Sequence, residues 1–374
     1  MKIGLVLQSG VELGGAHNYE ANFRISLIKV ATQLSHDVKT FVPQAAKKTD
    51  NSQDFVFYRS SPVRYAFAHL RSNPLFLALS RLIGLGMSHL EKQAIREGVD
   101  ILLFASPNHL SPGIHTVPIA TTAWDFGHLD LPHFPETGQN GLWQWREELY
   151  TATVARSVAI YCDSTSTKSR LVQRYGAQND RVNVVGLFPS IPDGVISEKL
   201  DKPHFIYPAM FWPHKNHLLL LSAFADFIAE KGPAAYLVLT GAGQLQKKVQ
   251  AHAESLGLSE LVKFKGLVPR MNLMGLLAGS KGLLMPSLLG PSNIPPLEAA
   301  LLGVPVVASD VHKMDEMLDG LHTVPSADIK SWTTAFNKLW DLEIKTPVIL
   351  GQDEEEQIRK SLAFIASQLH GLRK

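Results

Sequence analysis

The stretch that decides the fold runs from Lys281 to Glu316 and reads KGLLMPSLLGPSNIPPLEAALLGVPVVASDVHKMDE. A short apolar run over 282–285 is typical of a buried parallel strand, and a second such run covers 305–308. The turn-rich loop between them leads to two prolines, which the first turn of a helix tolerates because the missing N–H would have no partner there. Gly303 then ends the helix. The stretch therefore predicts a strand, a loop, a helix and a second strand.

Glu298 is the one charge inside the apolar part of this stretch, and we place it in the first turn of the helix. In open α/β sheets, ligands bind beyond the carboxyl ends of the strands, where the free N–H groups of a helix start favour anions. Two interpretations follow: Glu298 contacts a ligand, or it complements the helix dipole from the surface. The local pattern leaves both open.

Apolar runs and helical segments alternate along the rest of the chain. Strand-like runs cover residues 2–7, 37–42, 55–58, 101–105, 117–122, 158–162, 183–187, 204–207, 236–240 and 262–267. This alternation predicts parallel sheets with helices on both faces. Because 374 residues are too many for one ordinary core, we expect an α/β fold of two doubly wound, Rossmann-like domains.

The domain boundary is expected at 188–203, FPSIPDGVISEKLDKP, which is rich in proline and has no periodic apolar pattern. We therefore assign 1–187 to an N-terminal domain, 188–203 to a linker and 204–352 to a C-terminal domain. Residues 353–374 predict a final helix, with acidic residues first and basic residues last, as the helix dipole prefers.

Composition excludes several classes of protein. A hydrophobic content of 45% and a charged content of 19% are those of a folded globular chain, and a net charge of +2 gives no reason to expect a nucleic-acid partner. The single cysteine, Cys162, cannot form a disulfide within the chain, and no Cys/His spacing suggests zinc. Met1 leads directly into a strand-like run, so we expect no signal peptide and a cytoplasmic location.

The region from Arg59 to Arg96 is strongly basic. Its apolar core, residues 74–90, is interrupted by Arg81 and two glycines, so we expect no transmembrane helix. Arginines interleaved with aromatic and leucine side chains are typical of an interfacial helix pair, which predicts peripheral contact with an anionic membrane surface. The alternative is a helix packed on the sheet with a solvated basic face.

Two loops of the N-terminal half follow strand-like runs and carry candidate site residues. The loop GVELGGAHNYEANF contains Gly14 and Gly15 ahead of a helix, an arrangement that lets the backbone approach an anionic ligand. The loop AWDFGHLDLPHFPE follows the run 117–122 and brings Asp125 and His128 to the expected carboxyl edge of the sheet. In the C-terminal half, Gly241 follows the run 236–240 and is a further candidate for donor binding, although a plain turn explains it too.

The sequence resembles a known family over nearly the whole chain, and four blocks in its second half are the strongest parts of this resemblance. They are FIYPAMFWPHKNHLLLLSAF, LVLTGAGQ, VKFKGLVPRMNLMGLLAGSKGLLMPSL and IPPLEAALLGVPVVASD. In order and spacing they are similar to the motifs of retaining glycosyltransferase family 4. The resemblance implies the GT-B fold, with a cleft between its two domains and a C-terminal helix that returns to the N-terminal domain.

The resemblance also implies roles for residues of the C-terminal half. Glu298 matches the second glutamate of a paired-glutamate motif, which holds the ribose of the donor nucleotide. Lys215 matches the basic residue that neutralises the donor diphosphate, and the backbone of Asn293 and Ile294 lies where the family binds that diphosphate. Val268 matches the segment that contacts the base.

In the N-terminal half, Gly14 and Gly15 match the glycine loop beside the transferred sugar. The sequence departs from the family pattern at two donor positions. The first glutamate of the pair falls on Gly290, and an arginine of the phosphate block falls on Met210. Ser292 and Asn293 can supply some of the missing hydrogen bonds to the sugar. We therefore expect a variant subgroup of the family.

The function implied is a metal-independent, retaining hexosyltransferase. It moves a sugar from a nucleoside-diphosphate sugar to a hydroxyl of a glycan or lipid-linked acceptor in cell-surface polysaccharide or lipopolysaccharide assembly. The acceptor proton goes to Asp125, to His128 or to the leaving phosphate, and no cofactor beyond the co-substrate is expected. Two alternatives remain: a nucleotide-sugar epimerase of the same fold and a non-catalytic nucleotide-sugar-binding protein.

Overall fold

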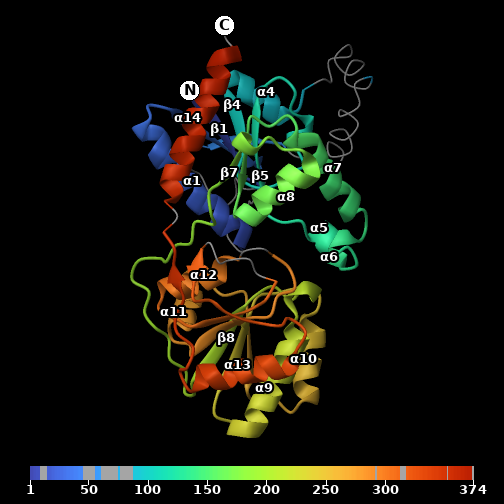
Figure 1. The fold of residues 1–374 in the computed structure, drawn as a ribbon, viewed down its shortest axis with the longest axis vertical. Helices are drawn as coiled ribbons and strands as arrows, with labels where there is room; N and C mark the ends of the chain where they lie inside the picture. Colours follow the sequence, from blue (N-terminus) through green and yellow to red (C-terminus); the bar gives the residue numbers. More distant parts are fainter. Residues whose placement is uncertain are drawn as a thin grey trace. The chain divides into compact units, whose positions relative to one another are not determined.

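The computed structural model describes residues 1–8, 15–44, 55–59, 75, 87–290, 293–311, 317–351 and 353–372. The chain forms two compact units. Unit 1 comprises Met1–Asp125, Gln144–Phe188 and Gln352–Lys374, and unit 2 comprises Phe126–Trp143 and Pro189–Gly351. Each unit is built on a parallel sheet covered by helices (Figure 1). The prediction of two doubly wound α/β domains is therefore confirmed.

Unit 1 contains a seven-stranded parallel sheet in the order β3-β2-β1-β4-β5-β6-β7. Its strands are β1 (Lys2–Val6), β2 (Asp37–Pro43), β3 (Phe55–Tyr58), β4 (Ile101–Phe104), β5 (Ile119–Ala123), β6 (Ala159–Cys162) and β7 (Val182–Val184). The strand order reverses between β1 and β4. The carboxyl ends of these two strands therefore flank the point where open α/β sheets bind ligands.

The helices of unit 1 include the last helix of the chain. They are α1 (Gly15–Gln33), α4 (His89–Arg96), α7 (Leu142–Val154), α8 (Thr165–Tyr175) and α14 (Glu354–Leu372), with short 3-10 turns η2 (Ser111–Gly113) and η3 (Asn179–Arg181). Helix α14 packs along α1, where Nζ of Lys29 lies 2.6 Å from Oε1 of Glu355. Its Ser361 hydroxyl donates to the hydroxyl of Tyr161 in β6 at 2.9 Å. The predicted return of the C-terminal helix to the N-terminal domain is confirmed.

Unit 2 contains a six-stranded parallel sheet in the order β10-β9-β8-β11-β12-β14. Its strands are β8 (His204–Pro208), β9 (Tyr236–Thr240), β10 (Val262–Gly266), β11 (Gly282–Met285), β12 (Val306–Ser309) and β14 (His322–Val324). A separate antiparallel pair joins β13 (Leu318–Asp319) to β15 (Val348–Ile349). The order reverses between β8 and β11, which sets the ligand-binding edge of this sheet.

The described part of unit 2 contains five longer helices, which cover the two faces of that sheet, and two short ones, α5 (Gly127–Asp130) and α6 (Pro135–Gly138). The longer helices are α9 (His217–Lys231), α10 (Gln246–Ser255), α11 (Arg270–Ala278), α12 (Ile294–Leu301) and α13 (Ile329–Trp340), with a 3-10 turn η4 (Pro213–Lys215). Helices α9, α10 and α13 pack together on one face, and α11 and α12 pack on the other (Figure 1). Because both faces are covered, every residue of β9, β11 and β12 is buried.

The stretch quoted first forms the predicted elements. Strand β11 leads through a loop to α12, whose first turn contains Pro295 and Pro296, and β12 follows. Because α12 begins at Ile294, Glu298 is its fifth residue and lies just beyond the first turn. The prediction that placed Glu298 in the first turn was therefore wrong by one position.

The domain boundaries differ from the predicted ones in two places. Residues 126–143, which were assigned to the N-terminal domain, group with unit 2. Of the expected linker 188–203, Phe188 ends unit 1 and the remainder belongs to unit 2. There the backbone N–H of Glu198 donates to the carbonyl of Gly275 at 2.9 Å, so this proline-rich segment packs along α11. Proline content revealed the lack of regular structure but could not reveal this packing.

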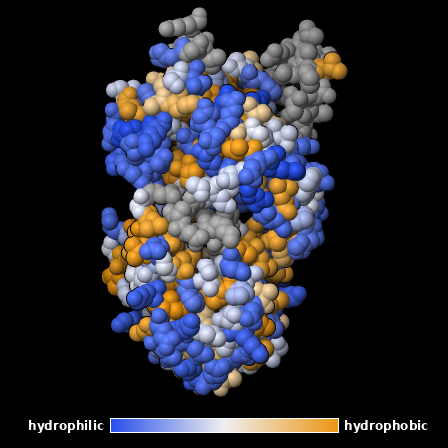
Figure 2. Space-filling view, viewed as in Figure 1, coloured by the Kyte–Doolittle hydropathy of each residue, from blue (hydrophilic) through white to orange (hydrophobic). Residues whose placement is uncertain are grey.

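The face of unit 2 that Figure 2 shows mixes hydrophilic and hydrophobic side chains, as is normal for a folded domain. None of the helices within the described ranges combines the length and apolar character needed to cross a bilayer. Most of the basic region 59–96 lies outside the described residues, which include Arg59 and the helix α4. The expected interfacial helix pair therefore stays a prediction.

Candidate functional site

The loop after β11 leads into α12 at the carboxyl edge of the unit 2 sheet. Asn293 is the residue before α12 and has an extended backbone, with no hydrogen bond from its side chain to the helix start. The first backbone N–H groups of a helix have no partner within the helix, and Ile294 offers such a group, whereas the two prolines after it do not. Gly290 has a φ of 114°, a conformation that favours glycine. Ser292 lies outside the described residues.

Glu298 is buried in unit 2 and is paired with a residue that the sequence did not identify. Its side chain is 4% exposed, and its Oε1 lies 2.7 Å from Nη2 of Arg270, the first residue of α11. The contact is an ion pair rather than a well-aligned hydrogen bond. Burial raises the pKa of Glu298, while the charge of Arg270 lowers it. The interpretation of Glu298 as a surface residue that complements the helix dipole is therefore wrong.

Arg270 is a functional candidate that sequence analysis missed. It lies 24% exposed at the start of α11, and its Nη2 also donates to the carbonyl of Ser190 at 2.5 Å. The signal available in the sequence was indirect: a carboxylate expected in an apolar unit requires a nearby cation. Which cation supplies that charge depends on how α11 packs beside α12.

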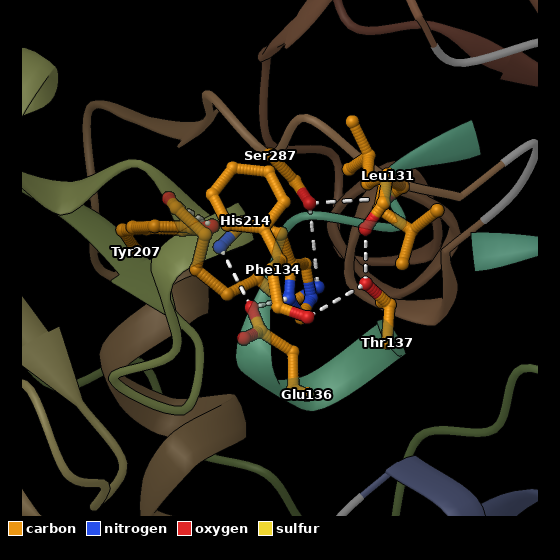
Figure 3. Close-up of polar contacts among 9 residues, drawn as sticks. Leu131, Phe134, Glu136, Thr137, Tyr207, His214 and Ser287 are labelled. Carbon is orange, nitrogen blue, oxygen red and sulfur yellow. Dashed lines mark hydrogen bonds and ion pairs between the residues drawn. The ribbon is translucent and has the colours of Figure 1, made fainter. Parts of the chain in front are cut away.

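Lys215 lies in the turn η4, next to the loop that follows β11. Its Nζ is 3.5 Å from Oγ of Ser287, and its backbone carbonyl accepts a hydrogen bond from the Tyr207 hydroxyl at 3.0 Å. Asn216, the residue before α9, has a left-handed backbone with a φ of 57°. Figure 3 shows Ser287 and Tyr207 beside this turn. The structure therefore brings Lys215 together with the loop that leads to Asn293 and Ile294.

The two other donor-side candidates have clear structural surroundings. Val268 is half-buried between β10 and α11, two residues before Arg270, and packs on the core of unit 2. Gly241 follows β9 with a φ of 113°, and a Cβ there would lie 2.4 Å from the carbonyl oxygen of Ala209. The close approach of two backbone segments explains this glycine without a ligand.

His217 is not a ligand candidate in this structure. It is buried, and its ring lies 4.9 Å from the ring of Tyr207 and 4.6 Å from that of Phe211. Burial, together with the charges of Lys215 and His214, lowers the pKa of His217 to about 3. Its ring is therefore neutral at physiological pH and packs as part of the core.

In unit 1, Asp125 follows β5 and is engaged by a guanidinium. Nη2 of Arg146 lies 3.0 Å and 3.1 Å from its two carboxylate oxygens, and the Tyr150 hydroxyl donates to its backbone carbonyl at 2.9 Å. Protonating Asp125 would cost this ion pair. The expectation that Asp125 accepts a proton from the acceptor hydroxyl is therefore weakened.

Asp163 offers a second carboxylate, directly after β6. It is 2% exposed, and it accepts a hydrogen bond from the Ser164 hydroxyl at 3.2 Å. Burial raises the pKa of Asp163 to about 7, an effect that hydrogen bonds from Thr167 and Ser164 reduce. A carboxyl group with such a shifted pKa at the carboxyl edge of a sheet is a candidate for proton transfer. In the chain it precedes Ser164, the residue that caps α8.

The remaining candidates have different surroundings. His128 lies in α5 of unit 2 with no exposed surface, and its ring packs edge-on to Trp143 at 6.3 Å. Gly15 begins α1, and a Cβ there would meet nothing within 4 Å, while Gly14 lies outside the described residues.

Glu20, one turn into α1, accepts hydrogen bonds from the backbone N–H of Gln8 at 3.0 Å and from Ser106. Glu20 thereby ties the ends of β1 and β4 to the helix that follows the glycine loop.

Two family models match the chain, each over less than half of its length. Glycosyltransferase Family 4 matches residues 22–187, and Glycosyl transferases group 1 matches residues 194–357. A curated relative is the O-antigen chain mannosyltransferase RfbU of Salmonella typhimurium, which is 25% identical over 200 residues. The match covers 52% of this chain and 54% of that protein, so the chain spans about half the length of this relative.

Solved structures of low identity share the fold. WaaG, a glycosyltransferase involved in lipopolysaccharide biosynthesis, has a TM-score of 0.67 at 13% identity, over 99% of this chain and 98% of that chain. Anabaena HepE, solved with UDP, has a TM-score of 0.63 at 16% identity, over 99% and 96%. Staphylococcus aureus TarM, solved with UDP, fondaparinux and a GlcNAc-glycerol, has a TM-score of 0.66 at 11% identity, over 99% of each. The first half of the chain thus matches a Family 4 model and the second half a group 1 model, and the whole chain shares the GT-B fold of these solved structures.

Proposed function

We propose that this protein transfers a hexosyl group from a nucleoside-diphosphate sugar to a hydroxyl of a glycan or lipid-linked acceptor. The proposed setting is the assembly of cell-surface polysaccharide or lipopolysaccharide on the cytoplasmic face of a membrane. The match to an O-antigen chain mannosyltransferase supports this setting. The basic region 59–96 supports an acceptor presented at an anionic surface.

One observation carries the proposal: Lys215 contacts the loop after β11, and this loop leads into α12. The Lys215 ammonium lies 3.5 Å from Oγ of Ser287, and α12 begins seven residues after Ser287, at Ile294. A lysine ammonium favours an anion such as a diphosphate, and so do the free N–H groups of a helix start. A leaving nucleoside diphosphate gains charge as its bond to the sugar breaks, so a fixed cation stabilises the transition state more than the ground state.

Glu298 is assigned to the ribose of the donor. An ionised carboxylate accepts hydrogen bonds from hydroxyl groups, and each such bond contributes roughly 1.5–3 kcal/mol. Burial opposes ionisation of Glu298, whereas Arg270 at 2.7 Å favours it. Arg270 thereby favours the ionised carboxylate, which accepts hydrogen bonds from hydroxyl groups. Val268, two residues before Arg270, is assigned to the base.

The reaction is proposed to retain the configuration of the anomeric carbon and to need no metal. The bond from that carbon to the leaving phosphate breaks, the bond to the acceptor oxygen forms, and the acceptor proton leaves. The ion pair of Asp125 with Arg146 and the burial of His128 disfavour these residues as proton acceptors. The leaving phosphate oxygen is the group that we favour for this step.

Mass spectrometry of products tests the proposal. The protein is incubated with UDP-, GDP- and ADP-hexoses, with and without lipid-linked glycans, and acceptors that gain one sugar are sought. Transfer that requires both donor and acceptor is expected, and Glu298→Gln should weaken nucleotide binding by about tenfold. Conversion of a nucleotide sugar without any acceptor, or binding without transfer to any acceptor, would contradict the proposed activity.

A further inference from the structure

Residues 126–143 follow β5 of unit 1 and include the first two residues of α7, the rest of which lies in unit 1, yet they group with unit 2. Within this segment the short helix α6 carries Glu136 in its first turn. The turn is held by the Thr137 hydroxyl, which donates to the carbonyl of Leu131 and to that of Phe134, the latter at 3.2 Å (Figure 3). These hydrogen bonds fix the turn that carries Glu136.

Glu136 accepts two hydrogen bonds from one residue of unit 2, His214. Its Oε1 accepts the backbone N–H of His214 at 2.9 Å and Nδ1 of the same residue at 2.6 Å (Figure 3). An ionised carboxylate only accepts hydrogen bonds, so Nδ1 of His214 carries the hydrogen. The side chains of His214 and Glu136 are 12% and 10% exposed. Charge-assisted hydrogen bonds with little exposure are stronger than neutral ones in water.

His214 immediately precedes Lys215 in the turn η4. The carbonyl of His214 accepts the backbone N–H of Leu288 at 2.7 Å, and the carbonyl of Lys215 accepts the Tyr207 hydroxyl. The turn is thus fixed from three sides: by β8, by the loop after β11 and by Glu136. A lysine side chain is long and flexible, so the position of its ammonium depends on how firmly its backbone is held.

We infer that Glu136 is a positioning residue for Lys215. It holds the His214–Lys215 turn so that the Lys215 ammonium faces the donor diphosphate, and it acts through hydrogen bonds rather than by touching the donor. The inference rests on the proposed function, because it needs Lys215 to bind the diphosphate. It also gives the segment between β5 and α7 a role in donor binding.

A double-mutant cycle tests this role. Affinities of the intact protein for UDP, GDP and ADP, and for the matching nucleosides, are measured by calorimetry. The variants are Glu136→Ala, Glu136→Gln, Lys215→Ala and Glu136→Ala combined with Lys215→Ala. Glu254→Ala, an exposed glutamate of α10, is the matched control. Thermal unfolding of each variant verifies that it is folded.

We expect Glu136→Ala to weaken binding of the preferred nucleoside diphosphate by about fivefold to tenfold and to leave its nucleoside nearly unchanged. In the Lys215→Ala background the same change should have almost no effect. Glu136→Gln should restore most of the affinity, because one amide oxygen can accept both hydrogen bonds of His214. Glu254→Ala should bind as the wild type does.

Equal losses from Glu136→Ala with and without Lys215 would overturn the inference, since they would indicate a general structural role. An unchanged diphosphate affinity in Glu136→Ala would overturn it as well. If the wild-type protein binds none of the three nucleoside diphosphates, the proposed function fails first, and the inference falls with it. The two failures are distinguishable, because failure of the proposed function appears already in the wild-type protein, whereas failure of the inference appears only in the variants.

Discussion

Replacing Arg270 with alanine probes the charge balance of the donor site. Nη2 of Arg270 lies 2.7 Å from Oε1 of Glu298, whose side chain is 4% exposed. A carboxylate at that depth has lost most of its hydration, and the guanidinium offsets the loss. Arg270→Ala leaves Glu298 without this counter-charge, so we expect unit 2 to be destabilised at neutral pH.

The structure sets the size of the effect. Removing one partner of a buried ion pair costs roughly 3–5 kcal/mol. Arg270 is 24% exposed, so in the variant water can reach the site and partly hydrate the Glu298 carboxylate. We therefore expect a cost of about 3 kcal/mol, at the lower end of that range. For a domain of this size each kcal/mol lowers Tm by roughly 2–4 °C, so Tm should fall by roughly 6–12 °C.

The effect should depend on pH in a defined direction. Burial raises the folded-state pKa of Glu298 above its ordinary value of 4.5, and Arg270 moderates that rise. Between the unfolded and folded pKa values the folded state binds more protons, so stability falls as the pH rises through this window. Removing Arg270 raises the pKa of Glu298 in the folded state further, so the loss of stability continues to higher pH. The difference in Tm between wild type and variant should therefore be small below pH 4.5 and grow toward pH 8.

Scanning calorimetry from pH 4 to pH 8 measures this difference. Lys231→Ala is the control in the same unit, because Lys231 and Asp341 are 3.4 Å apart and are 34% and 48% exposed. Such a surface pair contributes little. A loss of Tm in Arg270→Ala that matches the control, or that does not vary with pH, would refute the reasoning.

Three further outcomes are expected. Lys215→Ala should lower turnover by about tenfold or more, and it should weaken the binding of nucleoside diphosphates far more than the binding of nucleosides. The reverse pattern of affinities in calorimetry would exclude a role for Lys215 in neutralising the diphosphate. Burial raises the pKa of Asp163 from 3.8 to about 7, so its ionisation destabilises the folded state as the pH rises through that window. Asp163→Asn should therefore gain stability relative to wild type above pH 7, and a pH-independent difference in Tm would count against this pKa. A chelator should leave transfer unchanged, and loss of activity restored by added metal would contradict metal independence.

Much of the fold could be predicted because local pattern determines it. Apolar runs marked the strands that both helix layers cover, and Pro295, Pro296 and Gly303 marked the limits of α12 to within two residues. The alternation of strands and helices gave the class of both sheets. These features depend on neighbours in the sequence, so they can be read from it.

The partners of the site residues could not be predicted, because tertiary packing sets them. Glu298 is paired with Arg270 across two helices, and Asp125 with Arg146 across a strand end and a helix. Nothing in the residues near Glu136 indicated that it would bind His214. The grouping of residues 126–143 with unit 2 was missed for the same reason. Sequence analysis identified chemically capable groups, and only the fold reveals which are already engaged.

The central claim is that unit 2 binds a nucleoside diphosphate through Lys215 and the start of α12. Thermal unfolding of the wild-type protein with UDP, GDP, ADP and their hexose conjugates tests it most directly. A ligand at 100 times its Kd that binds only the folded state stabilises it by about 2.7 kcal/mol. We predict that at least one diphosphate raises Tm clearly, that its nucleoside raises it less, and that Lys215→Ala removes the difference. Unchanged Tm with every diphosphate at millimolar concentration would contradict the claim.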